Sequence, residues 1–225
     1  MPVIYQQQIN EDCRLGIWKI EETEEFFKGN VPLHRDVTHP HKRLQHLAGR
    51  FLLQYLYPDF PYSLIQIADT RKPFLPNEEY HFSISHCGDY AAAIVSKTHR
   101  VGIDVEEPRE RIFKVAGKFL SEKEMAMVNS EWSMVNRSMV NRSMVNGENP
   151  EPGTLNPELL TLLWSAKESI FKWYGDGGVD FANDIQLNGM DNENRQIDCY
   201  FVKANAELKV SYELLDGLIC SWVIF

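Results

Sequence analysis

The chain has 225 residues, of which 44% are hydrophobic, and its formal net charge is −9 at pH 7. This composition is typical of a soluble globular protein and supplies enough apolar residues to build a core. The acidic balance argues against non-specific nucleic-acid binding, and no apolar run is long enough to cross a bilayer. The N-terminus lacks the basic start and apolar stretch of a signal peptide, so we expect a cytoplasmic protein. Its four cysteines are scattered without zinc-ligand spacing, which predicts reduced thiols.

The first part of the chain is predicted to combine short strands with one long helix. In chain order we expect a strand at 16–20, an acidic helix start at 21–28, a helix at 41–56, a short strand at 64–68 and a loop at 69–80. The helix at 41–56 is the clearest of these, because its apolar residues recur at helical spacing on one face, at Leu44, Leu47, Phe51 and Tyr55. We expect Pro58 to end this helix.

Three strand-like runs follow, at 81–85, 91–96 and 101–106, and short turns separate them. Such turns predict an antiparallel meander, in which the first and third strands run in the same direction. The ends of those two strands would then meet at one edge of the sheet. This prediction brings His86 toward Asp104 and Glu106.

The second part of the chain is predicted to contain two helices and several closing strands. Ser121 and Glu124 form a capping-box pattern, S-E-K-E, which predicts a helix start. A five-residue tandem repeat at 133–146 matches neither the helix nor the strand period, so we interpret 129–157 as an expanded surface loop. A helix is expected at 159–174, and it is followed by strands at 184–187, 196–202, 208–214 and 219–225.

These elements predict the α+β class, with antiparallel sheets and two main helices. Each half of the chain carries one long helix and several strands. We therefore expect two α+β lobes, an N-terminal one over 1–100 and a C-terminal one over 101–225 that includes the repeat-containing loop.

Two short motifs place three carboxylates where a metal ion is expected. In V-G-I-D-V-E, strand alternation points Asp104 and Glu106 to the same side. In W-S-A-K-E-S-I-F-K, helical spacing stacks Trp164, Glu168 and Lys172 on one stripe. Half-buried carboxylates are costly unless they are paired or bind a metal, and Mg²⁺ prefers oxygen ligands. The motifs therefore predict a shared Mg²⁺ site, while the alternative is that Glu168 pairs with Lys172 and the strand acids are solvated.

A second group of residues suits phosphate binding. Lys72 precedes a rigid proline in a loop, which is a good place for a fixed phosphate contact. Ser85 and His86 close a strand at a turn, where their polar groups can reach a ligand. Arg43 and Arg50 lie two turns apart on one helical face, from which guanidinium groups can bind phosphates.

Two basic islands interrupt the acidic chain, at 34–50 and 109–123. On charge alone, solvated helix faces are the more ordinary interpretation, and the alternative is that the islands bind anionic partners. A Ser-His-Asp hydrolase is not indicated, because the chain has no G-x-S-x-G motif and strand alternation points Ser85 and His86 to opposite faces.

Six motifs occur in a characteristic order between about residue 40 and residue 175: K-R-L-Q-H-L-A-G-R, R-K-P, F-S-I-S-H, V-G-I-D-V-E, F-L-S-E-K-E and W-S-A-K-E-S-I-F-K. In these motifs the chain resembles the 4′-phosphopantetheinyl transferases of the longer, Sfp-type class. The resemblance implies a pseudo-dimer of two similar α+β lobes. It also implies transfer of the 4′-phosphopantetheine group of coenzyme A to a serine of an apo acyl- or peptidyl-carrier protein, with Mg²⁺ or Mn²⁺ and release of adenosine 3′,5′-bisphosphate.

The resemblance further implies roles for individual residues. The metal ligands would be Asp104, Glu106 and Glu168, and Glu168 with Lys172 would be the catalytic pair. The coenzyme A contacts would be Arg43, Arg50, Lys72, Ser85 and His86. The carrier-docking surface would include Phe119, Leu120 and the helix after Ser121. Cys87 stands where the family often has a serine, which removes one hydroxyl group from this set.

Two other functions use the same residues. A Mg²⁺-dependent nucleotide phosphohydrolase would employ the same acids and would release phosphate or nucleotide without any carrier. A non-catalytic module that binds carrier proteins or coenzyme A would tolerate the loss of Glu168 or Asp104, and both are present. For the transferase we expect a monomer that binds neither nucleic acid nor membranes.

Overall fold

The computed structural model describes residues 2–32, 37–130, 132 and 156–225, and within them the fold is α+β with antiparallel sheets, as predicted. The chain forms two compact units. Unit 1 comprises Met1–Val105, Lys172–Gly177 and Ile224–Phe225, and unit 2 comprises Glu106–Phe171 and Gly178–Val223. The two lobes and their pseudo-dimeric arrangement stay predictions. The tandem repeat at 133–146 lies outside the described residues.

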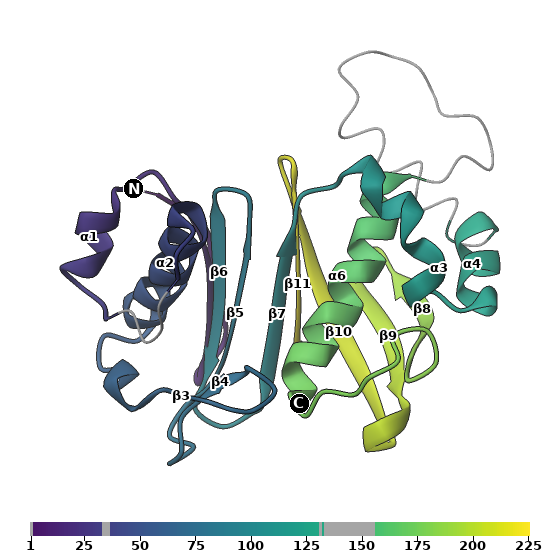
Figure 1. The fold of residues 1–225 in the computed structure, drawn as a ribbon. Helices are drawn as coiled ribbons and strands as arrows, with labels where there is room; N and C mark the ends of the chain where they lie inside the picture. Colours follow the sequence, from purple (N-terminus) through teal and green to yellow (C-terminus); the bar gives the residue numbers. More distant parts are fainter. Residues whose placement is uncertain (1, 33–36, 131, 133–155) are drawn as a thin grey trace. The chain divides into compact units, whose positions relative to one another are not determined.

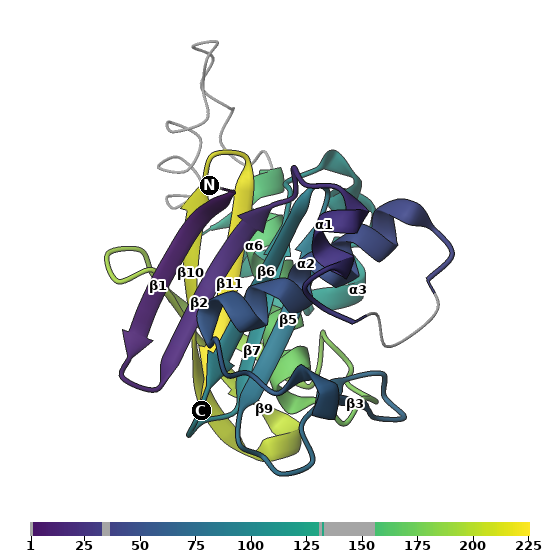
Figure 2. The same ribbon diagram turned by 90° about the vertical axis from the view of Figure 1, so that its left-hand side faces the viewer.

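Unit 1 is built on a four-stranded antiparallel sheet in the order β1-β2-β6-β5. Its strands are β1 (Val3–Asn10), β2 (Cys13–Lys19), β5 (His81–Cys87) and β6 (Tyr90–Ser96). The helix α2 (Pro40–Leu56) lies along one face of this sheet, and α1 (Glu24–Lys28) packs against α2 (Figure 1 and Figure 2). Apolar side chains from both layers form one buried cluster, and removing them from water holds the helix on the sheet.

The predicted meander is wrong in its third strand. β5 and β6 pair as antiparallel neighbours, but the other neighbour of β6 is β2, and β7 (Val101–Glu106) lies outside this sheet. The predicted meander placed β7 beside β6. The strand β2, which forms a hairpin with β1, lies there instead. The strand β1 escapes sequence-based prediction because three consecutive glutamines remove its apolar signal, although its burial alternates along its whole length.

Two serine side chains on β5 connect this strand to β7. The Oγ of Ser83 accepts a hydrogen bond from the backbone N–H of Ile103, and the Oγ of Ser85 accepts one from Val105, both at 3.2 Å. Two residues along β5 correspond to two residues along β7, so the strands run in the same direction. The end of β5 therefore lies beside Asp104, which is the proximity that the meander was expected to produce.

The loop predicted at 69–80 contains a short strand. It is β4 (Pro73–Phe74), and it pairs in antiparallel fashion with β3 (Gln66–Ile67). The 3-10 helix η1 (Tyr62–Leu64) precedes β3. Arg71 takes a positive φ of 68°, and its backbone N–H donates to the carbonyl of Ala68 at 2.8 Å, so the connection between the two strands is a tight turn.

The helix α2 confirms the prediction at 41–56, but the residues that face the sheet differ from the predicted stripe. Leu47, Leu52, Leu53 and Leu56 are buried, whereas Tyr55 is 40% exposed. Apolar residues occupy two adjoining stripes of this helix, so their spacing alone does not say which stripe packs on the sheet.

Gly49 lets α2 lie close to β5. A Cβ at this position would lie 2.6 Å from the Cγ2 of Ile84, which is closer than carbon atoms pack. We expect Gly49→Ala to lower the free energy of unfolding by about 1–3 kcal/mol through overpacking, despite the higher helix propensity of alanine. Gly117→Ala is the matched control, because among the described residues a Cβ there has no packing neighbour within 4 Å. Urea denaturation measures both, and an unchanged midpoint for Gly49→Ala would contradict the close packing.

Unit 2 packs a long helix on a sheet of four paired strands. The strands pair in antiparallel fashion in the order β8 (Ile185–Asp191), β9 (Gln196–Phe201), β10 (Ala206–Leu215) and β11 (Leu218–Ile224). The helix is α6 (Pro157–Tyr174), and the Oγ of Ser165 on α6 lies 2.8 Å from the Oγ of Ser221 on β11. These elements confirm the predicted second helix and the closing strands, with small shifts at their ends.

Within the described residues of unit 2, three short helical segments precede α6: η2 (Glu110–Lys114), α3 (Ala116–Phe119) and α4 (Glu122–Asn129). The capping box predicted at the start of α4 is present, because the Ser121 and Glu124 side chains each bond to the other's backbone N–H. A further 3-10 helix, η3 (Val202–Ala204), lies between β9 and β10. All four cysteines are buried, reduced thiols. In the part of the chain described here, every helix is too short or too polar to span a membrane.

Candidate active site

Ser85 is the centre of a polar cluster at the end of β5. Its hydroxyl donates to Oδ1 of Asp104 (2.9 Å). It accepts from the backbone N–H of Val105 (3.2 Å) and from Nζ of Lys172 (2.8 Å). A hydroxyl offers one donor and two acceptor sites, so these three partners use its full capacity. Ser85 is only 5% exposed, and the cluster is therefore buried and well defined.

Lys172 reaches this cluster from the last turn of α6. Its Nζ lies 2.6 Å from Oδ1 of Asp104, whose side chain is 4% exposed. A charge-assisted hydrogen bond of this kind is stronger than one between neutral groups. The two residues are 68 positions apart, so neither motif alone indicated that they meet.

The second carboxylate oxygen of Asp104 shows how this residue could bind a metal. Oδ2 is buried and has no hydrogen-bond partner among the described residues. A buried charged oxygen without a partner is costly, so this position favours a cation. Mg²⁺ binds carboxylate oxygens and usually keeps several waters, which suits a site with few protein ligands. Asp104 therefore fits the role that its motif predicts.

The other two predicted metal ligands belong to unit 2, whereas Asp104 belongs to unit 1. Glu106 lines a pocket with Arg109, and Glu168 lines a different pocket with Trp164. Within the described ranges, no three histidine, cysteine or acidic side chains are already grouped as metal ligands. The shared metal site of Asp104, Glu106 and Glu168 thus stays a prediction.

His86 follows Ser85 in β5 and faces the other side of the strand, toward α2. Its ring stands edge-on to the ring of His46, with 5.3 Å between the centroids. Burial is the main cause that lowers the pKa of His86 below its ordinary value, and the charge of Lys172 acts in the same direction. The imidazole is therefore neutral at neutral pH and can both donate and accept a hydrogen bond.

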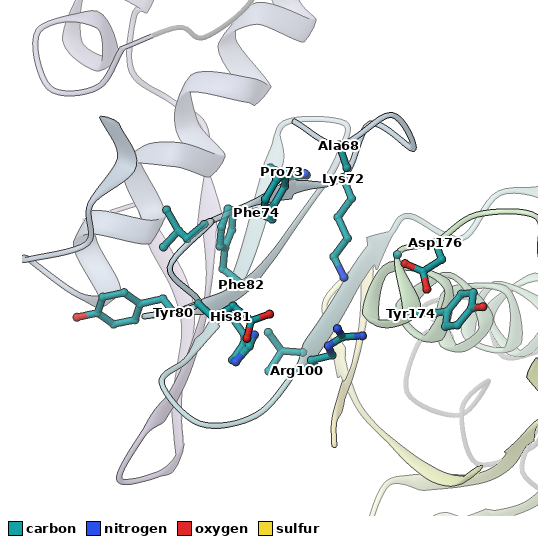
Figure 3. Close-up of a pocket in the computed structure, with 14 residues that line it drawn as sticks. Ala68, Lys72, Pro73, Phe74, Tyr80, His81, Phe82, Arg100, Tyr174 and Asp176 are labelled. Atoms are coloured by element: carbon teal, nitrogen blue, oxygen red, sulfur yellow. The ribbon is translucent and has the colours of Figure 1, made fainter. Parts of the chain in front are cut away.

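Lys72 lies in a pocket of about 280 Å³ in unit 1 that His81, Arg100 and Asp176 also line (Figure 3). Its Nζ donates to the backbone carbonyl of Trp173 at 2.9 Å. Burial, with a smaller contribution from Arg100, lowers the pKa of Lys72 to about 8. The ammonium group thus binds the protein's own backbone here, and its predicted contact with coenzyme A stays a prediction.

The two arginines of α2 lie in different surroundings. The guanidinium group of Arg43 pairs with both carboxylate oxygens of Glu24 on α1, at 2.6 and 2.8 Å, and donates to the carbonyl of Val37 at 2.8 Å. Hydrogen bonds from Arg43 and Lys28 hold the pKa of Glu24 at about 2. Arg50 is 6% exposed. Arg43 therefore links α2 to α1, and the phosphate-binding roles of both arginines stay predictions.

The side chains of Phe119 and Leu120 are buried, and their part in a docking surface stays a prediction. They are 1% and 3% exposed, and the ring of Phe119 packs edge-on against Trp164 of α6, with centroids 5.2 Å apart. These side chains belong to the core of unit 2, because α3 buries its apolar face against α6. Phe119 and Trp164 also line the pocket of Glu168, together with Phe171 and Phe181. Glu168 therefore borders an open pocket whose walls are mainly apolar.

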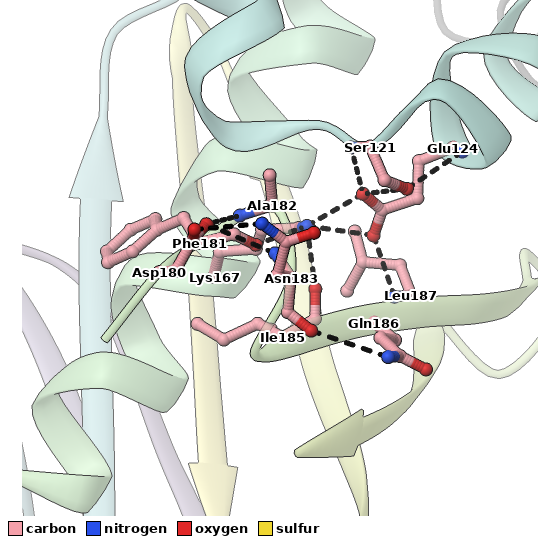
Figure 4. A network of polar contacts seen from close by, with 10 residues as sticks. All are labelled: Ser121, Glu124, Lys167, Asp180, Phe181, Ala182, Asn183, Ile185, Gln186 and Leu187. Carbon is pink, nitrogen blue, oxygen red and sulfur yellow. Dashed lines mark hydrogen bonds and ion pairs between the residues drawn. The ribbon is translucent and has the colours of Figure 1, made fainter. Parts of the chain in front are cut away.

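Lys167, the neighbour of Glu168, has a role that the sequence analysis missed. It is fully buried, and its Nζ donates to Oε2 of Glu124 (2.8 Å) and to the carbonyls of Phe181 (2.8 Å) and Ile185 (2.7 Å) (Figure 4). Burial lowers the pKa of Lys167, and Glu124 opposes that effect. The available signal was helical spacing, because Leu163 and Trp164 lie one turn before Lys167 and Ile170 and Phe171 lie one turn after it.

Part of the basic island at 109–123 lies beside Glu106. Arg109, Arg111 and Lys114 line one pocket of unit 2 together with Glu106 and Trp164. Glu107 lines the same hollow and pairs with Arg109, so Arg111 and Lys114 supply most of the positive charge that would favour an anionic partner.

Comparisons with known proteins agree with these motifs. A family model described as the 4′-phosphopantetheinyl transferase superfamily matches residues 100–223, which is more than half of the chain. Enterobactin synthase component D of Escherichia coli (strain K12) is 33% identical over 133 residues, which are 58% of this chain and 54% of that protein. The same component of Salmonella austin is 28% identical over 135 residues, or 60% of this chain and 49% of that protein.

A third relative covers more of the chain. The 4′-phosphopantetheinyl transferase gsp of Aneurinibacillus migulanus is 26% identical over 178 residues, which are 78% of this chain and 64% of that protein. The chain spans about half the length of the two enterobactin synthase components that it matches.

Proposed function

Since this chain belongs to the 4′-phosphopantetheinyl transferase superfamily, we propose that it transfers the 4′-phosphopantetheine group of coenzyme A to a serine of an apo acyl- or peptidyl-carrier protein. The observation that supports this most directly is the cluster of Asp104, Ser85 and Lys172, in which a buried carboxylate oxygen lacks a partner among the described residues. Such a site suits a divalent cation that binds a diphosphate, and coenzyme A carries a diphosphate.

In the proposed reaction the hydroxyl oxygen of the carrier serine attacks the phosphorus atom that bears the pantetheine arm. A new P–O bond forms to the serine, and the bond from that phosphorus to the bridging oxygen of the diphosphate breaks. The leaving group is adenosine 3′,5′-bisphosphate. Glu168 accepts the proton of the serine as general base. A carboxylate is a weak base for an alcohol, so the positioning of the reactants must supply much of the activation.

The proposed metal ligands are Asp104, Glu106 and Glu168, with Mg²⁺ as the preferred ion and Mn²⁺ as an alternative. The orphaned Oδ2 of Asp104 supports the first of these assignments. When bound, the ion neutralises negative charge on the diphosphate oxygens and on the leaving group.

Lys172 supplies fixed positive charge beside the reacting diphosphate in this proposal. Ser85 and Asp104 hold its ammonium group, so it needs little reorganisation as negative charge develops on the leaving group. His86, Arg43 and Arg50 remain the proposed contacts of coenzyme A. Ser85 would join them by exchanging one of the three partners that its hydroxyl has in this cluster.

The basic pocket of unit 2 is the proposed docking site for the carrier protein. Arg111, Lys114 and the Arg109–Glu107 ion pair line it, and Glu106, a proposed metal ligand, lines the same hollow. An acidic carrier would be steered to this surface by charge, which raises the association rate more than the final affinity. We also propose that the protein acts in the cytoplasm as a monomer, and its four reduced cysteines suit a reducing compartment.

The mass of a carrier protein tests the proposed transfer. We expect purified protein, coenzyme A and Mg²⁺ to convert an apo carrier to a form heavier by one phosphopantetheine group, and we expect chelation of the metal to prevent the change. A panel of apo carriers from fatty-acid, polyketide and peptide synthesis should be assayed side by side. An unchanged mass for every carrier would contradict the proposal, and release of phosphate or nucleotide without any carrier would favour a phosphohydrolase instead.

A further inference from the structure

The loop that precedes β4 holds the C-terminal end of α6 inside unit 1. The Nζ of Lys72 donates to the carbonyl of Trp173 at 2.9 Å, and the Oγ1 of Thr70 donates to the carbonyl of Gly175 at 2.8 Å. The last carbonyls of a helix have no partner within the helix itself. A cation at this end satisfies one of them and also interacts favourably with the helix dipole. The loop therefore caps α6 from outside.

Gly175 makes room for this cap. Its φ of +80° lies in the left-handed region that favours glycine, so the chain can turn away directly after the helix. A Cβ at this position would lie 2.5 Å from the Cδ and 2.7 Å from the Nζ of Lys72. The position thus requires glycine for a second reason, which is that any side chain would displace Lys72 from the carbonyl of Trp173.

The capped carbonyl is one residue away from Lys172. The ring of Trp173 stands edge-on to Phe225 with 5.6 Å between the centroids, and the backbone N–H of Phe225 donates to the carbonyl of Arg100 at 3.0 Å. The last turn of α6 is therefore held by Lys72 and by the chain terminus. Because Lys172 projects from this turn toward Ser85 and Asp104, the position of its ammonium group depends on how firmly the turn is held.

We infer that Lys72 is a positioning residue, whose ammonium group caps α6 and thereby holds Lys172 against Asp104 and Ser85. For its effect on rate, this inference depends on the proposed function, which gives Lys172 a part in the transfer. It assigns Lys72 a role different from the coenzyme A contact that the family resemblance implies.

Lys72→Met tests the inference, because methionine has a similar length but no charge and no donor. We expect kcat for carrier modification to fall about 10-fold to 100-fold, since a small displacement of Lys172 is costly. The KM for coenzyme A should stay within about threefold, because no binding contact is lost. Lys19→Met, which removes an exposed lysine of the same unit, is the matched control and should change neither constant. An unchanged kcat with a KM raised tenfold or more would overturn the inference in favour of a direct contact.

A second test uses the close approach of Gly175 and Lys72. Gly175→Ala alone should lower kcat by a similar factor, because the new methyl group pushes Lys72 from its acceptor. In a Lys72→Ala background the strain of the left-handed φ remains but that methyl group has nothing to displace, so Gly175→Ala should then have a clearly smaller effect. This non-additivity is what a double-mutant cycle measures for residues in contact. Strictly additive losses would show that the two residues act independently and would contradict the inference.

A third measurement needs no substrate and separates this inference from the proposed function. Hydrogen exchange of the backbone amides at the end of α6 should be at least about fivefold faster in Lys72→Met than in the unaltered protein, because the uncapped turn opens more often. Unchanged exchange would overturn the inference even if the protein modifies carriers normally. Failure of the unaltered protein to modify any carrier, together with faster exchange in the variant, would instead contradict the proposed function and leave the cap of α6 supported.

Discussion

Glu168→Gln is expected to lower kcat for carrier modification by about 10²-fold to 10⁴-fold, which is the usual contribution of a general base. Glutamine has the shape of glutamate, but its amide does not accept the proton of the carrier serine and is a poorer metal ligand than a carboxylate. The side chain borders an open pocket of unit 2, so the fold should tolerate the change. Steady-state rates, measured by the mass of the carrier, check this expectation.

The matched control is Glu158→Gln, which makes the same chemical change in the first turn of the same helix. This control should retain the rate of the unaltered protein, and circular dichroism should show the same fold for both variants. Full activity of Glu168→Gln would show that the general base has been misassigned. A loss in both variants would point to an effect on α6 and not on the chemistry.

Lys167→Met is expected to lower the free energy of unfolding by about 3–5 kcal/mol. The pair of Lys167 and Glu124 is fully buried, with 0% and 2% of the two side chains exposed. Removing the lysine leaves the carboxylate of Glu124 buried without its counter-charge, and it also leaves the carbonyls of Phe181 and Ile185 without a donor. Urea denaturation followed by fluorescence measures the loss.

Two further variants identify the cause of that loss. Combining Lys167→Met with Glu124→Gln should recover part of the stability, because the amide is neutral and its oxygen can still accept from Ser121. Lys209→Met breaks the exposed pair with Asp198 on the same sheet and should leave the denaturation midpoint nearly unchanged. If the buried and exposed variants lost the same amount of stability, the buried pair would not hold unit 2 together as the structure indicates.

Hydrophobic periodicity predicts the long elements of this fold well. The helices α2 and α6 and the four closing strands each have enough residues for a clear pattern, so their existence and type follow from the sequence. The partner of each strand does not follow. The apolar run of β6 predicts a strand that is buried on both faces, but it does not say whether the neighbour is β2 or β7, because pairing depends on segments distant in the chain.

The candidate site, too, could be predicted from the sequence only in part. Short motifs indicate Asp104 and Lys172 as candidate functional residues, because a charged group among apolar neighbours is costly to bury unless it is paired or binds a ligand. The hydroxyl that joins them belongs to Ser85, and only the packing of β5 beside β7 brings it there. A hydrophobicity pattern treats Lys167 as a polar residue that should face solvent. Its ammonium group is instead fully buried, because it donates to three acceptors in the protein. Sequence patterns therefore predict candidate groups better than they predict the partners of those groups.

The proposal depends most on one geometric claim, which is that Asp104, Glu106 and Glu168 bind the same cation. Crystals grown with coenzyme A and Mn²⁺ test it, because manganese gives an anomalous scattering peak at its own position. The account predicts a single strong peak in contact with the three carboxylates and with the diphosphate of coenzyme A. A peak bound elsewhere, or a Glu168 carboxylate far from the ion that Asp104 binds, would contradict the account.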